Sequence, residues 1–116
     1  MSETVNEPSG GQQEAIVYIG TKPVMTYVFE VISQFSSGLK EVRIKARGNS
    51  IAHAVDVAEV ARRHKMVEGK LQLKNVGIGT ERLVNRAGRE TNVSTIEITL
   101  ARTGEMRLDS ASTAAQ

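Results

Sequence analysis

The chain of 116 residues contains no cysteine and no tryptophan, and only two tyrosines, two phenylalanines and two prolines. Without cysteine it has neither a disulfide framework nor a thiolate metal site. It also lacks an uninterrupted apolar stretch of the roughly 18 residues that a membrane helix needs. Residues 1–14 are acidic and polar, unlike a secretory signal peptide. These absences predict a soluble intracellular protein with no membrane partner, and the length predicts one domain.

Acidic ends conceal a strong positive charge in the middle of the chain, whose formal net charge is only +2. Residues 1–14 carry three glutamates and no lysine or arginine, and residues 103–116 carry a net charge of −1, which leaves +6 for residues 15–102. Both ends lack apolar periodicity and are expected to be disordered, with residues 15–102 as the folded domain. A basic domain favours a polyanionic partner, although a solvated cationic surface explains the charge equally well.

The four aromatic residues, Tyr18, Tyr27, Phe29 and Phe35, lie in the first third of the chain, apart from most of the basic residues. Proteins that bind single-stranded nucleic acids stack bases on aromatic side chains set among cationic groups. The separation along the sequence therefore favours contacts with the backbone and grooves of a duplex.

Two stretches have the apolar spacing of amphipathic helices. The first begins near Pro23, with Thr21 or Lys22 near its N-cap, and ends before Gly38. The second is expected to be capped by the Ser50 side chain. Their predicted buried faces are Val24, Val28, Val31, Ile32 and Phe35 in the first helix, and Ile51, Ala54, Val55, Ala58 and Ala61 in the second.

Four stretches are predicted to be strands. Residues 15–19 are a short apolar run typical of a buried strand, and residues 42–47 alternate strictly between apolar and cationic side chains. The third strand starts near Leu71, and its apolar phase shifts before Val76, which indicates a β-bulge. The fourth directs three side chains towards the core: Ile96, Ile98 and Leu100. The order βαβαββ predicts an α/β two-layer sandwich, with two helices on a four-stranded mixed sheet.

Residues 79–92 join the last two strands and are the most informative part of the chain. They include Arg82, Arg86 and Arg89, are too polar for a core, and exceed the usual hairpin loop of about 2–5 residues. If both strands continue into this segment, each limb adds about six residues, or roughly 20 Å. A cationic arm of this length suits a groove of nucleic acid or its phosphate rim. The alternatives are a floppy loop and an arm used only for dimerisation.

Two further basic features lie outside the arm. Lys22 stands where a strand meets a helix, and free N–H groups at a helix start attract anions. Taken alone, an ordinary helix start is the better explanation of that feature. Arg43, Lys45 and Arg47 form a cationic stripe on one face of a strand, and their alternative role is to protect an exposed sheet edge from aggregation.

Catalytic and cofactor motifs are weak. Ser50, His53 and Asp56 share one helix face, but a catalytic triad also needs a cleft and an oxyanion hole. Ser50 is better explained as a cap and His53 as a surface residue. The spacing around Lys22 does not fit a P-loop, and Gly-Ile-Gly at residues 77–79 lacks the third glycine and the following helix of a dinucleotide site. The sequence predicts neither an enzyme nor a metal or cofactor site.

Four strings of residues complete the pattern: VYIGTKPVMTYV at 17–28, IKARGNSIAHAVDVAEVARR at 44–63, VGIGTE at 76–81 and VSTIEITL at 93–100. Together they resemble the Alba family of archaeal DNA- and RNA-binding proteins, over about residues 15–102. The resemblance implies a fold like the C-terminal domain of bacterial translation initiation factor 3, with a long hairpin arm between the last two strands. It also implies a cytoplasmic, chromosome-associated dimer that coats and compacts double-stranded DNA with little sequence preference and binds RNA.

The resemblance also assigns roles to individual residues. Lys22 matches the second basic residue of the family's IGKKPV motif, and Arg47 matches the arginine of its KARG motif. Arg86 and Arg89 fall in the family's arm, which reaches towards the minor groove. With the basic features above, the predicted nucleic-acid-binding residues are Lys22, Arg43, Lys45, Arg47, Asn49, Arg82, Arg86 and Arg89.

Three positions depart from the family pattern. Thr21 replaces the first lysine of IGKKPV, which is acetylated in some members. Lys65 stands where some members carry an aromatic that joins dimers along DNA, and Asn49 where some carry arginine. The expected partners are double-stranded DNA, RNA and a second copy of the chain or a paralogue. The alternative function is an RNA chaperone or ribonucleoprotein subunit with RNA as its main ligand.

Overall fold

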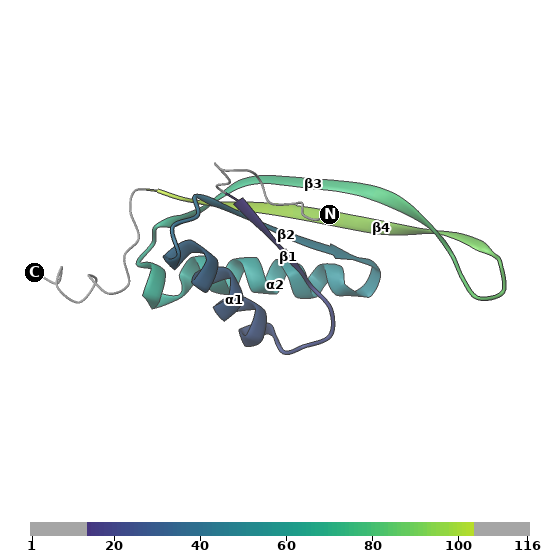
Figure 1. Ribbon diagram of the computed structural model, residues 1–116, viewed down its shortest axis with the longest axis horizontal. Coiled ribbons are helices and arrows are strands. Elements are labelled where there is room, and N and C mark those ends of the chain that lie inside the picture. Colours follow the sequence, from purple (N-terminus) through teal and green to yellow (C-terminus); the bar gives the residue numbers. More distant parts are fainter. Residues whose placement is uncertain (1–13, 104–116) are drawn as a thin grey trace, which may run out of the picture.

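The computed structural model describes residues 14–103, which form a four-stranded sheet with two helices on one of its faces (Figure 1). The elements are β1 (Glu14–Tyr18), α1 (Val24–Ser36), β2 (Glu41–Arg47), α2 (Ile51–Arg63), β3 (Leu71–Val84) and β4 (Glu90–Arg102). The predicted α/β two-layer fold and its element order are confirmed. The ends expected to be disordered, 1–14 and 103–116, lie outside the described residues except for Glu14, which already belongs to β1, and Thr103.

The strands lie in the order β1-β2-β4-β3, so β1 and β3 are the two outer strands. β1 and β2 run parallel, and α1 supplies the crossover that a parallel pair needs. β4 runs antiparallel to both of its neighbours, which confirms the predicted mixed sheet. A register shift between Leu73 and Asn75 confirms the predicted bulge.

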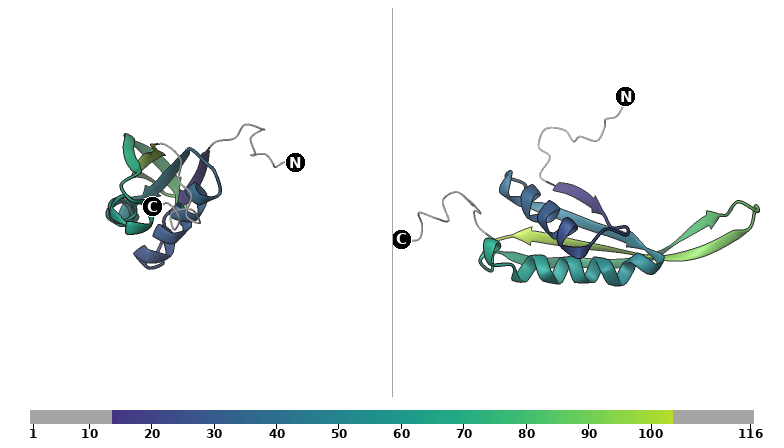
Figure 2. Two further views of the ribbon diagram at one scale, coloured as in Figure 1. Left: turned by 90° about the vertical axis from the view of Figure 1, so that its left-hand side faces the viewer. Right: turned by 90° about the horizontal axis from the view of Figure 1, so that it is seen from below.

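The core lies between the two helices and the sheet face that they cover (Figure 2). Phe35 and Val31 of α1 are fully buried, as predicted. In α2 the prediction was wrong at one position, because Val55 is 41% exposed and Val57 is buried in its place. Val57 lies on the flank of α2 that faces α1, whereas Val55 lies on the opposite flank, which no described helix covers.

The predicted start of α1 is confirmed, because its N-cap is Pro23, which directly follows Lys22. The side-chain cap predicted for α2 is absent. Ser50 does occupy the N-cap of α2, but its hydroxyl makes no capping bond. A short 3-10 helix (Gly48–Ser50) leads directly into α2 and gives Ser50 a helical backbone, whereas a capping residue normally has an extended one. At 13 residues each, α1 and α2 are shorter than a membrane-spanning helix, and no helix among the described residues is long and apolar enough to cross a membrane.

β3 and β4 continue beyond the body as a two-stranded arm, and the principal extents are 60 × 32 × 22 Å (Figures 1 and 2). Their pairing continues without a break from Gly79 opposite Thr95 to the end of β3. At the turn, the Asn85 side-chain oxygen accepts hydrogen bonds from the backbone N–H groups of Ala87 and Arg89, both at 2.9 Å. The segment is therefore a regular hairpin, as predicted, and not an irregular loop.

Candidate nucleic-acid interface

Lys22 lies in the loop between β1 and α1, and two side chains hold the backbone of this loop. The Tyr27 hydroxyl accepts hydrogen bonds from the N–H groups of Gly20, at 2.9 Å, and Lys22, at 3.2 Å. From α2, His53 Nε2 donates to the Lys22 carbonyl oxygen at 2.7 Å, and the His53 and Tyr27 rings meet edge to face at 6.0 Å. The loop backbone is tied to both helices while the Lys22 side chain remains exposed.

Sequence reasoning missed Tyr27 and took His53 for a surface residue, although both position the Lys22 loop. Tyr27 is only 5% exposed, and a buried tyrosine needs a partner for its hydroxyl. Gly20 is the signal in the sequence that points to this contact, because any side chain at position 20 would crowd the Tyr27 hydroxyl. A Cβ atom on Gly20 would lie 3.3 Å from Tyr27 Oη.

The cationic stripe of β2 is matched by carboxylates across the sheet. Arg43 Nε lies 3.4 Å and Lys45 Nζ 3.9 Å from oxygens of Glu97. Arg47 Nη1 lies 2.8 Å from an oxygen of Glu81. The pairs are partly or largely exposed to solvent, so each stabilises the fold only slightly, but together they offset two of the three positive charges. The stripe is therefore less cationic than the sequence alone indicates.

The tip of the arm has a different balance of positive and negative charge. Arg86 and Arg89 are exposed at the turn, and neither forms an ion pair within residues 14–103. Arg82 lies further back on the arm and pairs with Glu90 at 3.6 Å. The tip thus presents two cations whose charge no neighbouring carboxylate in this range offsets.

Three contacts place the Lys22 loop and the start of α2 beside the root of the arm (Figure 2). His53 joins the first turn of α2 to the Lys22 loop, and Arg47 joins the end of β2 to Glu81 of β3. A Cβ atom on Gly48 would lie only 3.4 Å from the Val93 side chain of β4. The structure therefore gathers Lys22, Arg47 and Asn49 at the root of the arm that carries Arg82, Arg86 and Arg89. Arg43 and Lys45 lie farther back along β2.

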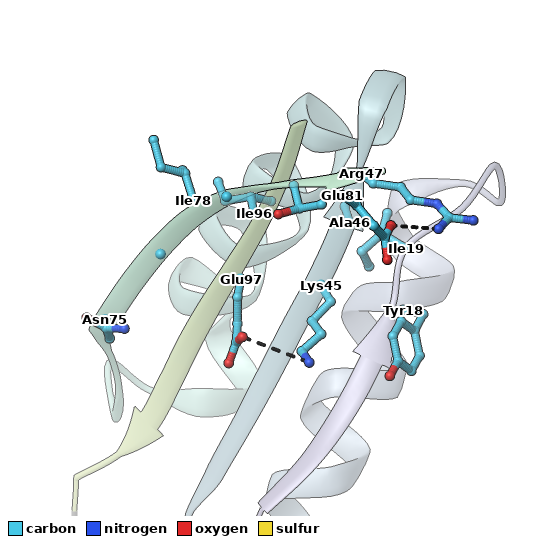
Figure 3. Close-up of a pocket in the computed structure, with 13 residues that line it drawn as sticks. Tyr18, Ile19, Lys45, Ala46, Arg47, Asn75, Ile78, Glu81, Ile96 and Glu97 are labelled. Carbon is cyan, nitrogen blue, oxygen red and sulfur yellow. Dashed lines mark hydrogen bonds and ion pairs between the residues drawn. The ribbon is translucent and has the colours of Figure 1, made fainter. Parts of the chain in front are cut away.

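Tyr18 does not follow the predicted separation of aromatic and basic residues. Its side chain is 69% exposed, and the parallel pairing of β1 with β2 sets it directly beside Lys45. Both side chains lie on the sheet face away from the helices (Figure 3). The prediction was wrong here because it measured distance along the sequence, whereas pairing between strands brings the two residues together.

Comparison with known proteins shows the family to which the chain belongs. The family model described as Alba matches residues 15–80. The chain belongs to the Alba family. It is 51% identical over 90 residues to the "DNA/RNA-binding protein Alba" of Methanothrix thermoacetophila, covering 78% of this chain and 98% of that protein. It is 47% identical over 89 residues to "DNA/RNA-binding protein Alba 1" of Archaeoglobus fulgidus, covering 77% and 97% respectively.

Solved structures of Alba proteins have the same architecture. "Alba from Thermoplasma volcanium" matches with a TM-score of 0.69 and 41% identity, over 75% of this chain and 99% of that one. ALBA1 from Trypanosoma brucei matches with a TM-score of 0.62 over 87% and 78% of the two chains; at 22% identity it shows the shared fold alone. Alba proteins form a non-enzymatic family, so the predictions of family and of a non-enzymatic protein are confirmed.

Proposed function

We propose that this protein binds double-stranded DNA with little sequence preference, coats and compacts the archaeal chromosome in the cytoplasm, and also binds RNA. The observation that carries the proposal is the arm, whose two tip arginines have no carboxylate partner within residues 14–103, next to the Lys22 loop that Tyr27 and His53 hold. Cations of this kind bind phosphates, which hold a protein on a duplex without reading its sequence. The names of the archaeal relatives, "DNA/RNA-binding protein Alba", support the same conclusion.

The geometry indicates which contacts with nucleic acid the arm and its root would each make. The arm is two strands wide and extends about 20 Å from the body, so it suits a groove and its phosphate rim. Lys22 and Arg47 lie at the arm's root, where they would contact the phosphates of the segment that the arm embraces. Asn49 adds an uncharged donor at the same place. Because these contacts reach phosphates rather than base edges, Lys22→Ala and Arg47→Ala should weaken binding to all sequences about equally.

The binding unit in this proposal is a homodimer, formed through the free edge of β3 and the adjacent flank of α2. Val76 and Ile78 of β3 are 48% and 84% exposed, although their partners across the sheet on β4 belong to the core or border it. Val55, on the uncovered flank of α2, adds to this apolar surface. Exposed apolar strips of this kind mark interaction sites, and a second copy would extend the core across the edge. Each dimer would then carry two arms.

Light scattering in solution tests the dimer. The wild-type protein should have the mass of two chains, and Ile78→Glu should reduce it to that of one chain, because it buries a charge at the interface. Ile16→Glu is the matched control, since Ile16 is also an exposed apolar strand residue, 42% exposed, but lies on β1 at the other edge. A monomeric wild-type protein would overturn this arrangement. A paralogue could replace the second copy. Mixing this chain with the paralogue would then give a complex with the mass of one chain of each.

A mobility-shift titration of duplex DNA and structured RNA at one salt concentration tests the proposed function as a whole. Binding to several unrelated duplexes with similar affinity would support it. Much tighter binding to RNA would favour the second candidate, an RNA chaperone or ribonucleoprotein subunit, which the "DNA/RNA" names of the relatives also allow. Failure to bind either nucleic acid would contradict both.

A further inference from the structure

We propose that the sheet face opposite the helices holds a second nucleic-acid site, which binds an unpaired nucleotide of a single strand. The site rests on the proposed function, because it extends nucleic-acid binding to a second surface. It shares Arg47 with the interface above but extends over the sheet face away from the arm, and it contains an aromatic side chain and a carboxylate as well as cations.

One row of residues crosses all four strands at this site. Tyr18 on β1 pairs with Lys45 on β2, Lys45 pairs with Glu97 on β4, and Glu97 pairs with Gly77 on β3. Paired residues point to the same face of a sheet, so the three side chains stand in a line. Figure 3 shows Lys45 between Tyr18 and Glu97, with its ammonium group directed towards the carboxylate.

A groove of about 760 Å³ runs over this row. The glycine at the end of the row keeps the groove open on the β3 side, because a Cβ atom on Gly77 would meet nothing within 4 Å. The volume falls in the range of about 300–1,000 Å³ that is typical of small-ligand sites. Within the described part of the chain both helices lie on the other side of the sheet (Figure 2), so neither of them covers the groove.

These groups match the parts of an unpaired nucleotide. The exposed ring of Tyr18 offers a stacking surface for a base, and every base has a face that stacks. Lys45 and Arg47 can reach the phosphate on either side of that base. Glu97 accepts hydrogen bonds from amino groups on a base edge, as carboxylates do with cytosine.

The carboxylate decides between a single strand and a duplex. A duplex presents mainly phosphates to a flat face, and the Glu97 carboxylate in the middle of the row can accept no hydrogen bond from them. Its base edges are paired and its base faces are stacked, so neither Tyr18 nor Glu97 would find a partner. A single strand exposes both the faces and the edges of its bases. The groups in the row therefore fit an unpaired nucleotide and not a duplex.

Fluorescence anisotropy with the full-length protein tests the site, using a mixed-sequence strand of about 12 nucleotides and a blunt duplex as probes. Tyr18→Ala should weaken binding of the single strand about tenfold, the loss expected for one stacked base, and leave duplex affinity within about twofold. Tyr18→Phe should retain the affinity, because the ring remains. Phe29→Ala is the control, since Phe29 is a half-exposed aromatic on α1, remote from the groove.

A second variant blocks the groove without touching the tyrosine. Gly77→Val places a strand-compatible side chain in open space and should reduce single-strand affinity while leaving the duplex bound. Tyr18→Trp provides a direct reading of stacking, because the chain has no other tryptophan. Its fluorescence should be quenched by the single strand and not by the duplex. The same sequence is then tested as an RNA strand and as a DNA strand to find which of the two the site binds more tightly. Quenching by either strand supports the proposed site.

The outcomes separate the two proposals. If the wild-type protein binds the duplex but Tyr18→Ala and Gly77→Val leave single-strand affinity unchanged, the second site is wrong and the proposed function stands. If the duplex is not bound at all, the proposed function fails, and the inference built on it fails with it.

Discussion

The β2 stripe and the arm each contribute three cations to the sequence, but the fold treats them differently. Glu97 lies between Arg43 and Lys45, and Glu81 faces Arg47. On the arm, only Arg82 has a carboxylate partner within residues 14–103. Equal runs of charge in the sequence thus become a nearly balanced surface in one region and an unbalanced tip in the other.

From this difference we expect pairing across the sheet, and not the count of cations, to decide where a polyanion binds. Phosphates lower their energy most where a cation has no competing carboxylate. The duplex should therefore meet the arm and its root, whereas the balanced face retains the mixed polarity that suits an unpaired nucleotide. Changing each region in turn should therefore affect duplex binding to different degrees.

Removing the arm should have the largest effect. Arg82 and Asn92 are directly paired, so deleting residues 83–91 and joining them through Asn-Gly leaves a standard two-residue hairpin. A dimer would lose four tip arginines, and at about 0.7 kcal/mol each its duplex affinity should fall about a hundredfold. Filter binding or anisotropy measures the loss. Circular dichroism is the folding control, because the deleted residues lie outside the core.

A folded deletion variant with unchanged duplex affinity would mean that the arm does not touch nucleic acid. The balanced stripe would then have to supply the contacts, and the comparison drawn above would be reversed.

Loosening the Lys22 loop should have an intermediate effect. Tyr27→Phe removes the acceptor for the N–H groups of Gly20 and Lys22, which should lower the free energy of unfolding by about 1–2 kcal/mol. Duplex affinity should fall a few-fold, and by less than in Lys22→Ala, because the charge remains but its backbone is less well held. Thermal unfolding and anisotropy measure the two effects. Tyr18→Phe, which removes an exposed hydroxyl, is the matched control; equal affinity for Tyr27→Phe and wild type would argue against positioning by Tyr27.

Replacing a cation that lies away from both regions should have the smallest effect on duplex affinity. Lys65 is exposed in the short 3-10 helix (Lys65–Val67) that follows α2, at the end of the molecule remote from the arm. If dimers meet there along DNA, their lysines repel each other. Lys65→Phe should then raise the cooperativity of binding with little change in the affinity of a single dimer. A gel-shift series gives the Hill slope, and an unchanged slope would count against this contact.

The fold was largely predictable because its signals are local. Strict alternation in β2 and the shift in apolar phase in β3 both follow from the two-residue period of a strand, and both are confirmed. The errors lie where neighbours from elsewhere decide. Val55 and Val57 have equally good helical spacing, and only the position of α1 decides which is buried.

The candidate site was less predictable, because its chemistry depends on strand register. Nothing near Lys45 in the sequence indicates that Tyr18 and Glu97 flank it, since both come from strands far along the chain. The hydroxyl of Tyr27 lies only five residues from Lys22, but the apolar spacing of α1 does not show that it turns back to accept from the Lys22 N–H group. Arg86 and Arg89 were predictable as arm residues, since a long segment without secondary structure is uncommon between two strands of a compact domain.

The most direct test of the central claim compares two double variants that remove the same charge: Arg86→Ala with Arg89→Ala at the tip, and Arg43→Ala with Lys45→Ala on the stripe. Duplex affinity is measured against salt from about 50 to 200 mM. If a dimer neutralises roughly six phosphates, the wild-type logarithmic slope is about −5, a loss on the order of 10³ over this range. The tip variant removes four arginines from a dimer and should flatten the slope by about 3.6, and the stripe variant by less than about 1. Equal flattening by both, or a larger effect of the stripe, would contradict the account.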